Sequence, residues 1–346
     1  MALLLVACSH AVEISHFPGT SQEDPPFQGN KGERYRLSDI NITAPVVLDS
    51  IHTAWLSTEG EIQVFNHVRT KEIERIDGKE PITNASYHPR SFYWVEADQK
   101  KNFVRFDLLT GRERWRIEGF SSATDPVLVD SLCIFTGVNG ELRAVDTLRG
   151  ETVWERKFDA RLFVSPVLFG KEMILATDSG ALRSLDPATG QTRWRFGEIT
   201  SAVMSLSEME GTVYLGTFDG QMISLDPADK SVNWAVETDY QVRNVPLVLG
   251  EKVYWVNAIG ELYSIEKENG TAELLRYFGT PTTGPPVYSA AGILISGRNG
   301  VLYQIENGSG QILDQMEFDG RLRNAPLFFR GEWYVGVEDH WIYEIQ

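Results

Sequence analysis

The chain has 346 residues, of which 42% are apolar, and it carries a formal net charge of −16 at pH 7. A charge of this sign repels phosphate groups, which argues against nucleic acid or an anionic membrane surface as a partner. The apolar content, which includes nine tryptophans, suffices for a sizeable core, and no segment is long enough to cross a bilayer as a helix.

The first eight residues are apolar and end in small residues followed by Cys8. This stretch resembles the end of a bacterial lipoprotein signal, in which the cysteine becomes the acylated first residue of the mature chain. It departs from that pattern because it is short and lacks a positively charged start, so an accidental apolar start is the alternative. The resemblance implies lipidation of Cys8, and Ser9 after it implies a periplasmic protein anchored to the outer membrane.

Residues 9–30 differ in composition from the rest, with prolines, glycines and polar residues and no apolar periodicity. Such a segment is typical of a flexible tether, which as a coil spans roughly 25 Å. The sequence therefore predicts a signal remnant at 1–8, a tether at 9–30 and a single domain at 31–346. The second cysteine, Cys133, lies in an apolar run and is expected to be buried.

One short sequence pattern rich in apolar residues recurs about every 40 residues along the domain. A fixed period of this size indicates a repeat architecture. The eight copies end at Asn66, Asp107, Asp146, Asp186, Asp226, Glu266, Glu306 and Gln346.

Each repeat contains four short apolar runs, seen best at 166–169, 173–177, 181–186 and 192–196. Glycine, asparagine and aspartate separate the runs, which is typical of antiparallel strands joined by tight turns. No sustained helical period is present, so we expect almost no helix. Four strands in about 40 residues make one blade of a β-propeller.

The last copy stops at Gln346, where the others turn into a fourth strand. The segment from Gly32 to Leu37 resembles a fourth strand such as the one from Gly111 to Ile117. Pairing this N-terminal strand with the C-terminal blade would cover two exposed edges and close the ring. We therefore predict an all-β, eight-bladed β-propeller of four-stranded antiparallel blades, closed by the N-terminal strand.

Asp186, Gly190 and Trp194 form the pattern Asp-x-x-x-Gly-x-x-x-Trp, which recurs from Asp107 and from Asp146. This pattern resembles the PQQ-like repeat family, named after quinoprotein dehydrogenases, over about nine-tenths of the chain. We expect the glycine to make the turn between strands three and four and the tryptophan to pack between neighbouring blades.

Two functions compete within that family. The quinoprotein enzymes hold a quinone and Ca²⁺, and they often carry a pair of adjacent cysteines. This chain has no such pair, no haem-attachment motif, and six histidines without metal-ligand spacing. We therefore predict no enzyme activity, no cofactor, no catalytic residue and no metal site.

The other branch consists of the BamB-like lipoproteins of outer-membrane β-barrel assembly. The resemblance rests on the lipoprotein-like start, the tether, eight repeats of this length and closure by the N-terminal strand. It implies a binding scaffold with a β-barrel assembly component as partner, monomeric outside its complex and attached to the membrane only through its lipid. A scaffold of another envelope complex and a quinoprotein-like enzyme are the alternatives.

Arginines gather in the loops that lead from strand four of one blade to strand one of the next. A positive spot in a chain of net charge −16 fits a partner or anion site, whereas bonds to loop carbonyls or nearby carboxylates are the alternative. The resemblance implies partner contact at the loop after the third blade, although the family's aspartates are absent from the next loop, 197–203. The predicted partner-binding residues are Arg161, Leu162, Phe163, Arg243, Asn244, Arg321 and Arg323.

Overall fold

The structure is a computed structural model. It describes residues 31–36, 45–57, 61–68, 71–77, 82–88, 91–96, 102–107, 112–120, 122, 124–197, 199–338 and 340–345. The predicted lipidation site Cys8 and the tether 9–30 lie outside the described residues.

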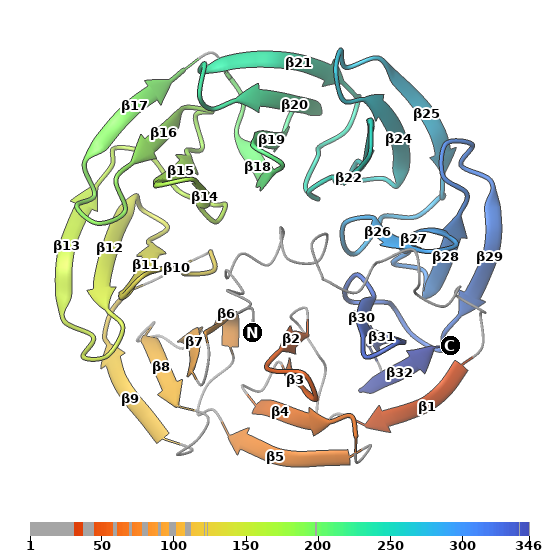
Figure 1. Ribbon diagram of the computed structural model, residues 1–346, viewed down its shortest axis with the longest axis horizontal. Coiled ribbons are helices and arrows are strands. Elements are labelled where there is room, and N and C mark those ends of the chain that lie inside the picture. The colour runs from red at the N-terminus through yellow and green to blue at the C-terminus, as the bar shows by residue number, and fades with distance from the viewer. Residues whose placement is uncertain are drawn as a thin grey trace.

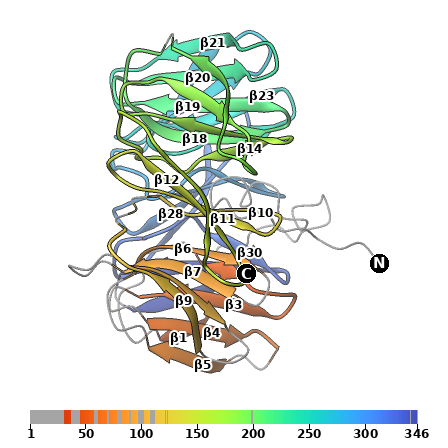
Figure 2. The same cartoon turned by 90° about the vertical axis from the view of Figure 1, so that its left-hand side faces the viewer.

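Eight four-stranded antiparallel sheets stand around a central axis and form a flat disc (Figures 1 and 2). The prediction of an all-β, eight-bladed propeller is therefore confirmed. The described residues contain no helix, and hence none that is long and apolar enough to cross a membrane.

The blades follow one another in chain order. Blade 1 contains β2 (Val46–Val47), β3 (His52–Leu56), β4 (Glu61–Asn66) and β5 (Lys71–Asp77), and blade 2 contains β6 (Ile82–His88), β7 (Ser91–Glu96), β8 (Phe103–Asp107) and β9 (Arg112–Ile117). Blade 3 contains β10 (Val127–Val129), β11 (Leu132–Thr136), β12 (Glu141–Asp146) and β13 (Thr152–Lys157), and blade 4 contains β14 (Val167–Phe169), β15 (Glu172–Ala176), β16 (Leu182–Leu185) and β17 (Thr192–Phe196). Blade 5 contains β18 (Val203–Met209), β19 (Thr212–Thr217), β20 (Gln221–Asp226) and β21 (Ser231–Glu237), and blade 6 contains β22 (Leu247–Leu249), β23 (Lys252–Val256), β24 (Glu261–Glu266) and β25 (Ala272–Tyr277). Blade 7 contains β26 (Val287–Ser289), β27 (Gly292–Ser296), β28 (Val301–Ile305) and β29 (Ile312–Glu317), and blade 8 combines β30 (Leu327–Phe329), β31 (Glu332–Val337) and β32 (Trp341–Ile345) with β1 (Lys31–Arg36).

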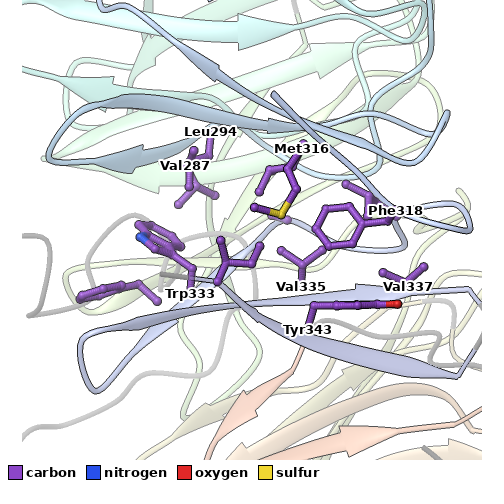
Figure 3. Packing of buried hydrophobic residues seen from close by; sticks show 13 residues of the cluster. Val287, Leu294, Met316, Phe318, Trp333, Val335, Val337 and Tyr343 are labelled. Carbon is purple, nitrogen blue, oxygen red and sulfur yellow. The ribbon is translucent and has the colours of Figure 1, made fainter. Parts of the chain in front are cut away.

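The hydrophobic core lies between the blades. Between blades 7 and 8, Leu294 and Met316 face Trp333 and Val335 across the seam, and Phe318 stacks edge-on against Tyr343 at 5.1 Å (Figure 3). Buried clusters of the same kind lie between other described blades, so neighbouring blades stabilise each other around the ring.

The repeated Gly and Trp positions lock neighbouring blades together. Trp154 at the end of blade 3 donates its indole N–H to the carbonyl of Pro187 in blade 4, at 2.9 Å. A Cβ on Gly190 would lie 2.6 Å from the Trp154 ring, and Gly190 has a φ of +66°. The glycine is therefore needed for its backbone conformation and for the close approach of the tryptophan. Trp115 and Trp234 make the same contact with Gly150 and Gly270.

The seam between blades 4 and 5 departs from this rule. Lys230 stands at the glycine position with a φ of +57°, so a side chain occupies the place that a docking tryptophan would need. Trp194 donates its indole N–H to Glu172 Oε2 of its own blade instead, at 2.7 Å. A missing glycine has thus redirected a tryptophan that keeps its position in the repeat.

The N-terminal strand β1 pairs antiparallel with β32 as the fourth strand of blade 8. Tyr35 donates its hydroxyl to Glu344 at 3.1 Å, and the Arg34 guanidinium lies 4.1 Å from the centre of the Trp341 ring. On the other side of this blade the ring of His67 packs edge-on against Phe329 and Tyr334. Burial, with smaller contributions from nearby cationic groups, lowers the pKa of His67 to about 4.

Candidate partner-binding face

The loops between blades lie on the same face as the turns between strands two and three. In blade 4 the N–H of Asp178 in such a turn donates to the carbonyl of Arg161 in the preceding loop, at 3.0 Å. The same bond joins Arg298 to Pro281 at 2.8 Å and Glu338 to Arg321 at 2.9 Å. These repeated bonds fix each loop to its own blade, so the exposed side chains of this face are held on a rigid base.

Each of three loops is also anchored by one buried apolar side chain. Leu162, Val242 and Leu322 hold the same repeat position and are at most 1% exposed. Because backbone neighbours of an inward side chain tend to point outward, the residues flanking these anchors are presented to solvent. Arg161 and Phe163 flank Leu162 in this way, and both are exposed.

The burial of Leu162 changes one predicted residue role. Its side chain packs among Ile134, Trp154 and Leu185 between blades 3 and 4. It is therefore unavailable for direct contact with a partner, and we do not carry that role forward. The resemblance to the BamB-like proteins had implied partner contact for this loop as a whole, including its apolar residues.

The central channel opens on this face through a cavity of about 300 Å³. Its lining residues come from the loops and first strands of successive blades, and β14, β18, β22, β26 and β30 are the innermost strands of their blades (Figure 1). Phe163, which is 41% exposed, lines the mouth. The other apolar lining residues include Met204, Leu206, Val245, Pro285 and Ala325.

A second cavity, of about 380 Å³, lies over blades 6, 7 and 8. We call it the arginine pocket because Arg243, Arg298, Arg321 and Arg323 line it. The structure thus brings together three of the predicted arginines and Asn244, which also borders this pocket. Arg161 lines neither cavity, and it remains apart on blade 4.

One carboxylate balances part of the charge in the arginine pocket. Glu338 accepts a bond from Arg323 at 2.5 Å and lies 3.6 Å from Arg321. Arg243 bonds to the neutral amide of Gln241, at 2.8 Å from Nε. Among the described residues no carboxylate lies within ion-pair distance of Arg243 or Arg298. Internal bonds therefore hold three of the four arginines, Arg321 and Arg323 through a carboxylate and Arg243 through a side-chain amide carbonyl.

Arg298 is the functional candidate that sequence reasoning missed. It lies in the turn between β27 and β28, at the repeat position that Ala258 and Glu338 hold in the neighbouring blades. The prediction considered only the loops between blades. Aligning the turns by the repeat would have revealed Arg298 as a lone cation beside the arginine-bearing loops.

The chemistry that this face can support is binding. Guanidinium groups stay protonated at neutral pH, so the arginine pocket can hold an anion. In the part of the chain that the structure describes, no three His, Cys, Asp or Glu side chains gather in a way that could hold a metal ion. Cys133 is buried, in agreement with the prediction from its apolar neighbourhood.

Comparison with known proteins gives one family. The protein-family model described as "Outer membrane protein assembly factor BamB" matches residues 99–209 and 179–273, which together span half of the chain. No curated protein sequence matches the chain.

Several solved structures share the fold. BamB from Moraxella catarrhalis is 17% identical, with a TM-score of 0.76 over 92% of this chain and 99% of that one. The computationally designed Ika8 protein is 14% identical, with a TM-score of 0.77 over 90% and 98%. Sqt1 from Saccharomyces cerevisiae is 10% identical, with a TM-score of 0.76 over 91% and 98%. At these identities the likeness extends to the propeller fold.

Proposed function

We propose that this chain is a binding scaffold in outer-membrane β-barrel assembly. The premise is that the chain belongs to the PQQ-like repeat family described as outer membrane protein assembly factor BamB. It acts without catalysis, by holding a soluble part of a barrel-assembly component against a rigid ring. The family match is the single observation that carries this proposal. In this role the protein binds no cofactor. It is a monomer when it is outside its complex.

The proposed location is the periplasm, at the outer membrane. Residues 1–8 act as the signal remnant, a lipid on Cys8 is the anchor, and residues 9–30 are the tether that holds the propeller of residues 31–346. Replacing Cys8 with Ser removes the acylation site. We expect the Cys8→Ser protein to leave the membrane fraction, and recovery in that fraction at the wild-type level would contradict the anchor.

The proposed docking site is the face that carries the loops between blades. Phe163 and Arg161 stand next to each other on blade 4, one an exposed aromatic and the other an exposed cation, with Leu162 fixing the backbone between them. Aromatic side chains and arginine are the residue types that contribute most at protein interfaces, above all where the backbone is already ordered. Arg243, Asn244, Arg321 and Arg323 extend this site around the channel mouth.

The first experiment identifies the complex. The protein is purified from detergent-solubilised envelopes and the co-purifying proteins are identified by mass spectrometry. We expect a β-barrel assembly component. Recovery of a different envelope complex would support the alternative scaffold role, and binding of pyrroloquinoline quinone with Ca²⁺ would revive the enzyme.

The second experiment tests the docking site with a matched control. Arg161→Glu combined with Phe163→Ala should weaken the pull-down of the partner by at least ten-fold, because it reverses one charge and removes one aromatic contact. Leu148 and Arg149 form another exposed apolar and cationic pair in the turn between β12 and β13, on the opposite face. Leu148→Ala with Arg149→Glu should leave the pull-down unchanged. Equal losses in both double variants, or none in the first, would contradict this face.

A further inference from the structure

We propose that the arginine pocket binds the acidic side chains of an extended partner segment, whose apolar residue enters the neighbouring channel mouth. This inference rests on the proposed function, because it specifies the chemistry of the partner that docks on this face. It concerns blades 6 to 8, whereas Arg161 and Phe163 lie on the loop into blade 4.

The charge of the pocket is the first observation. Four guanidinium groups line it and one carboxylate, that of Glu338, lies against two of them. The local excess is positive in a chain whose net charge is −16. Guanidinium groups bind carboxylates through two parallel hydrogen bonds, which favours a ligand that carries carboxylates.

Unused hydrogen-bonding capacity is the second observation. The Nε–H of Arg323 is buried and has no hydrogen-bond partner in the structure, although the other end of the same guanidinium bonds to Glu338. The Asn244 amide and the Thr282 hydroxyl bond to each other at 2.9 Å along the pocket wall. The buried Nε–H of Arg323 is out of a ligand's reach, whereas the Thr282 hydroxyl accepts the Asn244 bond and keeps its own O–H as a donor beside the arginines.

The exposure of the arginines indicates the size of the ligand. Arg321 is 55% exposed and Arg323 is 34% exposed, while Arg243 and Arg298 are also exposed. Arginines that remain in water hold a small free anion only weakly, since water screens the attraction. A polypeptide segment that covers the cavity of about 380 Å³ would exclude that water and strengthen every ion pair beneath it.

The neighbouring channel mouth explains the apolar part of the ligand. Arg243 and Asn244 border both the arginine pocket and the channel cavity, so the two sites are continuous. On the channel side the lining includes the apolar residues Val245, Pro285 and Ala325, while the carboxylate-bearing Asp125 also lines this cavity. A segment that alternates acidic and apolar residues would therefore satisfy both sites at once.

Glu338 acts as an internal competitor in this arrangement. In the free protein its carboxylate holds Arg321 and Arg323, and a ligand carboxylate must share or replace these bonds. Removing that negative charge should therefore tighten binding, whereas removing any of the arginines should weaken it. A gain of affinity cannot arise from damage to the fold.

The test uses a fluorescein-labelled synthetic peptide with two Glu-Glu-Leu triplets joined by a Gly-Ser spacer. Fluorescence anisotropy measures its binding to the purified protein, with the same peptide carrying Gln in place of Glu as the ligand control. We expect the Glu peptide to bind at least ten-fold more tightly than the Gln peptide, with an affinity that falls as the salt concentration rises.

The protein variants then locate the site. Arg298→Glu should weaken binding of the Glu peptide by roughly ten-fold or more, and Glu338→Gln should tighten it several-fold. Arg149→Glu on the opposite face makes the same charge change and should have no effect. The proposal is overturned if Arg298→Glu binds like the wild type, if Glu338→Gln binds more weakly, or if Arg149→Glu weakens binding as much as Arg298→Glu.

Inorganic phosphate separates a peptide site from a small-anion site. We expect millimolar phosphate to displace the peptide no better than chloride at the same ionic strength. Displacement by phosphate alone at that concentration would show a small-anion site and overturn the proposal. Because the peptide assay needs no co-purified partner, its failure leaves the envelope pull-down standing, and the converse also holds.

Discussion

The contact between Gly190 and Trp154 allows a sharp test of how the blades are held together. We propose to compare Gly190→Ala with Gly170→Ala, two substitutions within blade 4. Both glycines have positive φ, +66° and +56° respectively. A Cβ on Gly170 would meet nothing within 4 Å, whereas a Cβ on Gly190 would lie 2.6 Å from the Trp154 ring. The pair therefore separates backbone strain from steric contact.

The expected losses of unfolding free energy differ by a factor of about three to five. Placing Ala in the left-handed region costs about 1 kcal/mol, which is the whole effect expected for Gly170→Ala. Gly190→Ala adds the displacement of Trp154, which is 7% exposed, at about 1–3 kcal/mol for overpacking. Losing the indole bond to Pro187 adds about 1 kcal/mol. We therefore expect a total loss of about 3–5 kcal/mol.

Equilibrium urea unfolding monitored by tryptophan fluorescence measures both variants against the wild type. The comparison holds when the dependence of the unfolding free energy on urea is the same in all three proteins. Adding Trp154→Ala to Gly190→Ala should make the two losses less than additive, because the first substitution removes the group that the new methyl displaces. Equal losses for Gly170→Ala and Gly190→Ala would refute the close-contact argument.

Two further predictions concern other seams. The folded-state pKa of His67 lies near 4, below its unfolded value of about 6.5, so stability is lost as the pH falls between these values. Allowing for partial exposure of the ring, we expect a loss of about 1–2 kcal/mol from pH 7 to pH 4, and a smaller acid loss in His67→Gln. Thermal unfolding at pH 7 and pH 4 measures the loss of stability. If His67→Gln loses as much stability in acid as the wild type, His67 is not the source of that loss. Lys230→Gly should raise the unfolding free energy by about 0.5–1 kcal/mol, because glycine adopts the left-handed backbone without strain and leaves room for Trp194 to dock. A lower unfolding free energy in urea would contradict this prediction.

The strand order, the blade count and the role of the Gly–Trp pattern could be predicted from the sequence alone. These features are local and periodic. A turn glycine needs only its own φ, and a strand needs only its own alternation, so each repeat confirms the others. The fourth strand of blade 8 could also be predicted, because the segment around Tyr35 matches the fourth-strand sequence pattern that the last repeat lacks.

The composition of the binding face was decided by the tertiary structure. Arg243 and Arg323 are far apart in the sequence, and they border one pocket only because blades 6 and 8 flank blade 7. Whether Leu162 points inward and whether Glu338 lies against two arginines depend on packing between elements, which no local pattern encodes. A repeat specifies what each blade is, since its signals lie within one blade. The binding site lies between blades, and the distances between side chains of different blades are set only when the ring has formed.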